Sequence, residues 1–251
     1  MTVTPAFSND TLLTPRLAIS WSIVALFVGN VAAIIYCQQL LDTNVLNTPE
    51  LLRNGAVISL TITMSALFQI GVLATAIQIR GVSFSEYIGL ALPSKQQIIV
   101  SLVMLDIFVV LVEGSIYLLG GNLVPAFQID VYQSAKAIMA LPALFSALVL
   151  MAPIAEEIMF RGFLYRSLTQ QPGKEIYAII ITTLAWSLLH VQYDLMGLMQ
   201  VFAMGLFLGA VRWKTGSTGL TILMHVMLNF QAMTETVIKV DGLTLLKMMA
   251  L

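Results

Sequence analysis

Two stretches of 25 residues, 17–41 and 55–79, contain no charged residue. As helices, both are long enough to cross about 30 Å of hydrocarbon with some tilt, at roughly 1.5 Å per residue. The whole chain of 251 residues is 59% hydrophobic and only 10% charged, and its mean hydropathy is +0.92. Soluble domains do not have this composition. The sequence therefore predicts an all-α, polytopic membrane protein.

Further apolar segments follow, and turn signals rich in Gly and Pro separate several of them. They cover residues 98–120, about 137–168, 175–190, 195–211, and a stretch after Gly216 that carries His225. The tail, 234–251, is amphipathic and is read either as a shorter eighth segment or as an interfacial helix. We expect a helical bundle of seven to eight transmembrane segments.

The chain divides into a polar leader, 1–16, and a single transmembrane domain, 17–251. The motif-bearing core of that domain covers about 137–233. Between the second and third spans, Phe84 and Tyr87 suit a half-helix at the membrane interface.

Lysine and arginine counts predict the orientation. With the N-terminus inside, the inner segments hold eight of these residues and the outer ones hold four. The inner set is Arg16, Arg80, Lys95, Arg161, Arg166, Lys174, Arg212 and Lys214, and the outer set is Arg53, Lys136, Lys239 and Lys247. This bias predicts a multi-pass protein of the cell membrane with a cytoplasmic N-terminus. We expect the motif-bearing helices to open towards the cytoplasm.

Composition excludes two classes of partner or scaffold. The formal net charge is -1 and no basic block is present, so nothing indicates nucleic-acid binding. The single cysteine, Cys37, excludes a disulfide framework and a cysteine-rich metal site.

Two adjacent carboxylates, Glu156 and Glu157, lie at the end of an apolar run. Acids in a membrane segment cost about 3 kcal/mol on insertion scales, so they usually face a protein interior or a watered cavity. In a helix, Glu157 and Arg161 are four apart and share a face, which predicts an ion pair. Glu156 lacks that partner and is the better candidate for a general base. An interfacial charge cluster without catalytic role is the alternative.

Asp106 and Glu113, in the third predicted span, are seven apart and therefore share a helical face. We expect both to look into the bundle, either as proton-relay or ion-coordinating groups or as acceptors of hydrogen bonds from neighbouring helices.

The chain has only two histidines, His190 and His225, and both follow in late apolar segments. Glu156 and His190 lie at similar sequence distances from the turn at Pro172, so antiparallel helices place them at one depth. His225 and Asn229 are four apart and project from one helical face. His225 is only nine residues past its turn, and its depth relative to Glu156 stays open.

Such a set of residues suits hydrolysis. A glutamate and a histidine can hold and deprotonate a water, while a second histidine and an amide stabilise an oxyanion. Alternatively, Glu156, His190 and His225 could bind zinc, although no His-Glu-x-x-His spacing is present.

Three ordered motifs carry a resemblance to a known family: Glu156-Glu157-x-x-x-Arg161, Trp186-x-x-x-His190 and His225-x-x-x-Asn229. In order and residue type they resemble the CAAX-protease and bacteriocin-processing (CPBP, or Abi) family of intramembrane endopeptidases. The second motif of that family usually starts with Phe, so Trp186 is a departure that puts pocket size and substrate choice in doubt.

The resemblance implies an all-helical fold of about eight spans and peptide hydrolysis near the membrane face. By that analogy Glu156 and His190 activate water, His225 and Asn229 form the oxyanion hole, and Glu157 and Arg161 support them. The substrate would be a membrane-associated peptide or protein, lipid-modified or unmodified, in the lipid bilayer. We expect no cofactor, with zinc as the alternative. Two alternatives stay open. One is a proton- or ion-coupled transporter using Asp106, Glu113, Glu156 and Glu157, and the other is a non-catalytic immunity or chaperone partner.

Overall fold

A computed structural model of the chain describes residues 12–41, 49–91 and 93–249. Within these ranges every regular element is a helix. Most of the predicted leader, 1–16, lies outside the described residues. Leu12 and Leu13, at its described end, are buried against the core.

Five helices in the described part are long and apolar enough to cross a membrane. They are α1 (Pro15–Leu41), α2 (Gly55–Gln78), α4 (Lys95–Leu118), a segmented helix from Leu141 to Leu168, and α10 (Leu195–Thr215). Polar caps begin three of them: Asn54 and Asp194 accept backbone N–H groups of α2 and α10, and Ser94 forms a capping box with Gln97. The predicted all-helical membrane architecture is confirmed.

The segmented helix contains two π-helical stretches on either side of the paired glutamates. Its parts are α6 (Leu141–Phe145), η3 (Ser146–Met151), α7 (Ala152–Glu157), η4 (Ile158–Leu164) and α8 (Tyr165–Leu168). Pro153 lies two residues after the end of η3, as expected where a proline removes a backbone donor. The extra residue in π-helical turns often marks functional positions.

Shorter elements complete the bundle. These are η2 (Pro49–Arg53), α3 (Phe84–Ile88), α5 (Ala126–Ala137) and α9 (Glu175–Ser187). The last helix, α11, runs without interruption from Thr218 to Met249. The prediction of a separate segment at 234–251 is therefore wrong for the described residues, because the seventh span continues into the tail as one helix.

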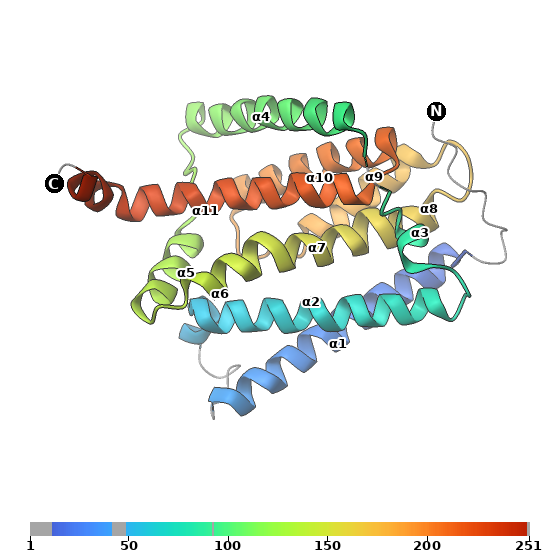
Figure 1. The fold of residues 1–251 in the computed structure, drawn as a ribbon, viewed down its shortest axis with the longest axis horizontal. Helices are drawn as coiled ribbons and strands as arrows, with labels where there is room; N and C mark the ends of the chain where they lie inside the picture. Colours follow the sequence, from blue (N-terminus) through green and yellow to red (C-terminus); the bar gives the residue numbers. More distant parts are fainter. Residues whose placement is uncertain (1–11, 42–48, 92, 250–251) are drawn as a thin grey trace.

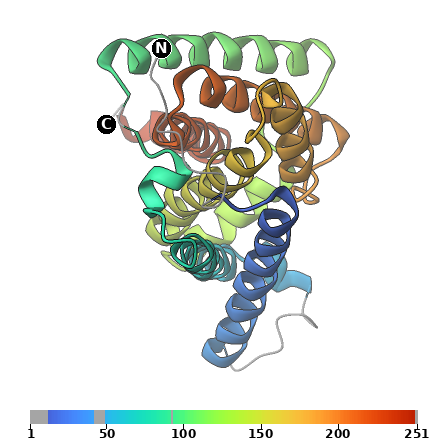
Figure 2. The ribbon, with the colours of Figure 1, turned by 90° about the vertical axis from the view of Figure 1, so that its right-hand side faces the viewer.

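Helices α2, α7 and α11 lie roughly parallel, with α7 between α2 on one side and α11 on the other (Figure 1). Helix α4 forms the outer edge, and Figure 2 shows it standing apart from α1 and α2. Helices α9 and α10 pack closely, because a Cβ on Gly205 would lie 2.5 Å from the Thr183 side chain and one on Gly209 2.8 Å from that of Ile179. The Gly205–Gly209 pair thus acts as the predicted small-residue contact face.

The expected side-chain placements have different outcomes. Asp106 is exposed on α4, because this peripheral helix turns only one side to the bundle, so the expectation that it faces the bundle is wrong. Glu113 is half-buried and accepts a hydrogen bond from Gln231 of α11 at 3.1 Å, one of the two expected roles. The expected short helix is present as α3, with Tyr87 completely buried against Phe163.

Candidate active site

Glu157 joins two motifs through a single carboxylate oxygen. Its Oε1 accepts a hydrogen bond from Arg161 Nη1 at 2.8 Å and lies 3.1 Å from His225 Nδ1. The Glu157 side chain is 0% exposed, and Arg161 and His225 are also buried. The predicted ion pair of Glu157 and Arg161 is present, and it also fixes the ring of His225.

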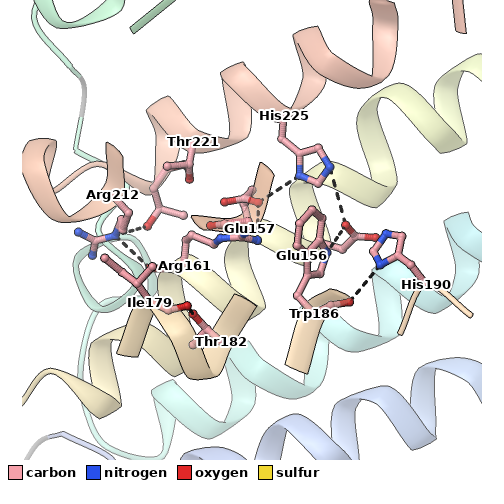
Figure 3. Close-up of polar contacts among 12 residues, drawn as sticks. Glu156, Glu157, Arg161, Ile179, Thr182, Trp186, His190, Arg212, Thr221 and His225 are labelled. Atoms are coloured by element: carbon pink, nitrogen blue, oxygen red, sulfur yellow. Dashed lines mark hydrogen bonds and ion pairs between the residues drawn. The ribbon is translucent and has the colours of Figure 1, made fainter. Parts of the chain in front are cut away.

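Glu156 is on the accessible side of the same helix, and its side chain remains 29% exposed. Its Oε2 accepts a hydrogen bond from Trp186 Nε1 at 2.7 Å and lies 3.9 Å from His225 Nε2. In Figure 3 the Glu156 carboxylate lies between the rings of His225 and His190. The sequence analysis leaves Glu156 without a partner. In the structure Glu156 has one, the Trp186 indole, and it lies between both histidines.

His190 follows the end of α9 and is oriented by the backbone of that helix. Its Nδ1 lies 3.0 Å from the carbonyl oxygen of Trp186. Because a carbonyl oxygen can only accept, Nδ1 of the neutral ring carries the proton and Nε2 holds the lone pair. The structure thus brings Glu156, His190 and His225 together around Trp186, whose ring contacts both histidine rings edge-on at 5.0 and 5.4 Å.

The side-chain amide of Asn229 donates to a backbone carbonyl of η3 that has no donor within its own helix. The N–H of Ala152 bonds to Ala147, and residue 153, the next donor in a π-helical pattern, is proline. The carbonyl of Leu148 instead accepts Asn229 Nδ2 at 2.7 Å. One of the two amide protons of Asn229 is thus engaged, and the other remains for a ligand.

The depth of His225, which the sequence left open, follows from the position of the turn before α11. Arg212 Nε donates to the carbonyl of Arg161 at 3.0 Å and lies 3.0 Å from the Thr218 hydroxyl. This turn therefore lies beside Arg161 and not beside the earlier turn at Pro172. From there, seven residues of α11 rise about 10 Å, enough to bring His225 level with Glu156.

Two cavities reach Asn229 from the end of the bundle where α1 ends. The larger, about 540 Å³, lies between α1, α2, α5 and α11, and the smaller, about 120 Å³, lies between α4, α10 and α11. Both are also lined by Tyr193, whose ring is nearly parallel to that of His190 at 6.0 Å. The expectation that the motif-bearing helices open towards the cytoplasm stays a prediction.

A family model described as type II CAAX prenyl endopeptidase, Rce1-like, matches residues 138–231. That range contains the six predicted site residues and the contacts described above. This part of the chain is similar to the CAAX-protease family. Comparison with curated proteins and with solved structures gave no match. Together with the apolar helices, the match indicates a multi-pass membrane protein, and it suggests protease activity of the CAAX type.

The zinc alternative can be compared with the side chains of this site. In the part of the chain that the structure describes, no group of three or more His, Cys, Asp or Glu side chains is placed to hold a metal ion. In both histidines Nδ1 contacts an acceptor and Nε2 is left, an arrangement that zinc-binding histidines also have. The expectation of no cofactor stays a prediction, with zinc as the alternative.

The hydrogen bond of Trp186 is the feature of the candidate site that sequence reasoning missed. The sequence analysis relates this residue to pocket size, but its indole N–H donates to the candidate base Glu156, and Arg161 lies over the ring at 4.5 Å. The spacing Trp186-x-x-x-His190 was the available signal, since residues four apart share a helical face. By contrast, Asp106 is exposed on the outer helix, so the acids of the transporter hypothesis do not form one group.

Proposed function

We propose that this chain is an intramembrane endopeptidase of the CAAX-protease type. It hydrolyses a peptide bond of a membrane-associated polypeptide, with a water activated by Glu156 and His190. The observation that carries the proposal is the split between the two adjacent glutamates. Glu157 is buried in an ion pair and orients His225, while Glu156 is partly exposed between the two histidines.

In the proposed mechanism, a water lies between the Glu156 carboxylate and Nε2 of His190. Glu156 takes a proton as the water oxygen attacks the scissile carbonyl carbon. The resulting oxyanion accepts hydrogen bonds from Nε2–H of His225 and from the free amide proton of Asn229. Glu156 then returns the proton to the amide nitrogen as the C–N bond breaks, which leaves a carboxylic acid and an amine.

Glu157 and Trp186 have supporting roles in this scheme. Nδ1–H of His225 donates to Glu157, which holds the ring so that its Nε2 lies on the side of Glu156. The indole N–H of Trp186 fixes one oxygen of Glu156 and leaves the other for the water. No cofactor enters the scheme, and zinc remains the alternative that the experiment below tests.

The membrane arrangement forms part of the proposal. Helix α9 has 13 residues, fewer than the roughly 20 that a full span needs, and α11 carries several charges in its second half. We place both in the bilayer beside the five apolar helices, which gives seven membrane-embedded segments with a cytoplasmic N-terminus in the cell membrane. The bilayer and a membrane-associated polypeptide, lipid-modified or unmodified, are the partners.

Cleavage of a quenched membrane-peptide library by the purified protein tests this function. Wild type and Glu156→Gln are compared, each with and without a strong zinc chelator. We expect cleavage that survives the chelator and is lost in the variant. Cleavage lost to the chelator and restored by zinc would replace water activation by Glu156 with metal chemistry. Cleavage that persists in Glu156→Gln would refute the role of Glu156.

A further inference from the structure

A groove of about 510 Å³ lies between α4 and α10. Its lining includes Gln97, Ser101 and Met104 on α4 and Phe207, Val211 and Lys214 on α10. These residues cover about two turns of each helix, or roughly 10 Å along the bundle. Among the described residues that line the groove, none is acidic and none belongs to the paired-glutamate site. The groove is therefore separate from the candidate active site.

One end of the groove carries positive charge. Where α4 begins and α10 ends, the lining residues are Gln96, Gln97, Lys214 and Thr215. Lys95, exposed at the first position of α4, places a second ammonium group at this end. Neither lysine forms an ion pair with another described residue, and the Lys214 ammonium lies 4.5 Å over the exposed ring of Trp213. Tryptophan and lysine are both typical of the membrane–water interface. This end therefore suits an anionic head group at the membrane surface.

One turn from the charged end, a hydroxyl lines the groove. Ser101 is only 7% exposed, and its Oγ has no hydrogen-bond partner among the residues that the structure describes. A buried hydroxyl without a partner is unfavourable, so we expect a ligand to supply an acceptor there. The other residues on this part of the lining are apolar, and they include Val100, Met104 and Phe207.

The order of these groups along the groove matches the order of groups in a glycerophospholipid. A lysine ammonium binds a phosphate as a point charge, and a serine hydroxyl can donate to the carbonyl oxygen of a fatty-acid ester. The apolar part of the groove can then bury an acyl chain. In the membrane arrangement proposed above, the charged end lies at the cytoplasmic surface, where basic residues between helices bind anionic head groups.

We propose that this groove binds one anionic phospholipid of the surrounding bilayer, with its phosphate at Lys214 and an acyl chain along Met104 and Phe207. The bound lipid joins α4, the outer helix of the bundle, to α10. Helix α10 also supports the candidate active site, because the carbonyl of Gly205 accepts Arg161 Nη2 at 3.2 Å. Lipid binding itself does not depend on the proposed peptide hydrolysis.

Native mass spectrometry of the full chain in detergent tests this binding. The protein is titrated with dioleoyl phosphatidylglycerol or with dioleoyl phosphatidylcholine, which share their acyl chains and differ in head-group charge. Lys214→Gln removes the charge in the groove, and Lys174→Gln, at an exposed position before α9, is its matched control. Ala210→Phe fills the groove, and Met199→Phe, at an exposed position of the same helix outside it, is the control for added bulk.

We expect one phosphatidylglycerol to bind at least about tenfold more tightly than phosphatidylcholine, since each lysine near an anionic head group contributes about fivefold. Lys214→Gln should lower this preference about fivefold, and Lys174→Gln should leave it unchanged. Ala210→Phe should lose binding of both lipids, whereas Met199→Phe should retain it.

Three results would overturn the proposal. One is equal affinity of the wild type for the two lipids. Another is an equal loss of preference in Lys214→Gln and Lys174→Gln, which would indicate attraction to the whole surface and no defined site. The third is full lipid binding by Ala210→Phe, or retention by the wild type of a peptide or an isoprenoid in place of phospholipid. Because no peptide is cleaved in this experiment, the lipid site and the peptidase can fail independently.

Discussion

The two ends of the bundle differ in what surrounds the paired glutamates. Towards the N-terminal side, Glu157, Arg161 and Arg212 form a buried polar network that α3 covers. Towards the other side, Glu156 is partly exposed, and Asn229 lines cavities with exposed apolar margins. Two neighbouring residues of one helix thus belong to different environments. The difference shows how one motif can supply both a rigid support and a reactive group.

The largest effect is expected at the closed end. Arg161→Ala leaves the buried Glu157 carboxylate without its cation, and breaking a buried pair costs about 3–5 kcal/mol. We expect most of the variant to lose its folded state in detergent, measured by thermal unfolding. Arg53→Ala breaks the exposed pair with Asp130 and should cost less than about 1 kcal/mol. Equal losses in the two variants would contradict a rigid closed end.

Trp186→Phe tests the hydrogen bond that links the two environments. Phe keeps an aromatic ring but cannot donate to Glu156, and a hydrogen bond to a charged group contributes about 1.5–3 kcal/mol. We expect kcat to fall at least about tenfold with little change in KM. The exposed Trp213 provides the control, since Trp213→Phe should leave both constants unchanged. Wild-type kcat in Trp186→Phe would remove Trp186 from the mechanism.

Asn229→Ala tests the link between α11 and the π-helical stretch η3. The substitution leaves the Leu148 carbonyl without its donor, which costs about 1–3 kcal/mol in the free energy of unfolding. Pro153→Ala supplies a new backbone N–H nearby. In the Pro153→Ala background we expect Asn229→Ala to lower the free energy of unfolding by about 1 kcal/mol less than it does in the wild type. A double-mutant cycle measures this difference. Additive losses would show that Pro153 does not create the need for Asn229.

The smallest effect is expected at the cavity margin. Leu52→Ala removes an exposed apolar side chain there, so the free energy of unfolding should change by no more than about 0.5 kcal/mol. KM should stay unchanged, because the described residues that line the large cavity include neither histidine nor Glu156. Ile79→Ala, at an exposed position on the other side of the bundle, is the control and should also leave KM unchanged. A rise in KM in Leu52→Ala alone would contradict this expectation and place the large cavity on the substrate path.

Sequence reasoning located most long helices, because a charge-free run of about 20 residues in a membrane protein usually forms a spanning helix. It found the pair of Glu157 and Arg161 because helical spacing alone places them together. It misplaced Asp106 because periodicity shows which residues share a face, but not whether a neighbour covers that face.

Other features depend on contacts that no local pattern records. The two π-helical stretches depart from the 3.6-residue period on which the sequence analysis relied. The depth of His225 depends on a turn that hydrogen bonds hold beside Arg161. The donor role of Trp186 requires the exact direction of its indole N–H, which residue type and spacing do not give.

The most direct test of the split between the two ends compares Glu156→Gln with Glu157→Gln in one assay of folded fraction and peptide hydrolysis. Both substitutions remove one charge at adjacent positions, so each is the control for the other. We predict that Glu156→Gln remains folded and has no turnover, while Glu157→Gln loses folded protein because the buried Arg161 and His225 lose the negative charge they pair with. Turnover in folded Glu156→Gln, or unchanged stability and activity in Glu157→Gln, would contradict the account.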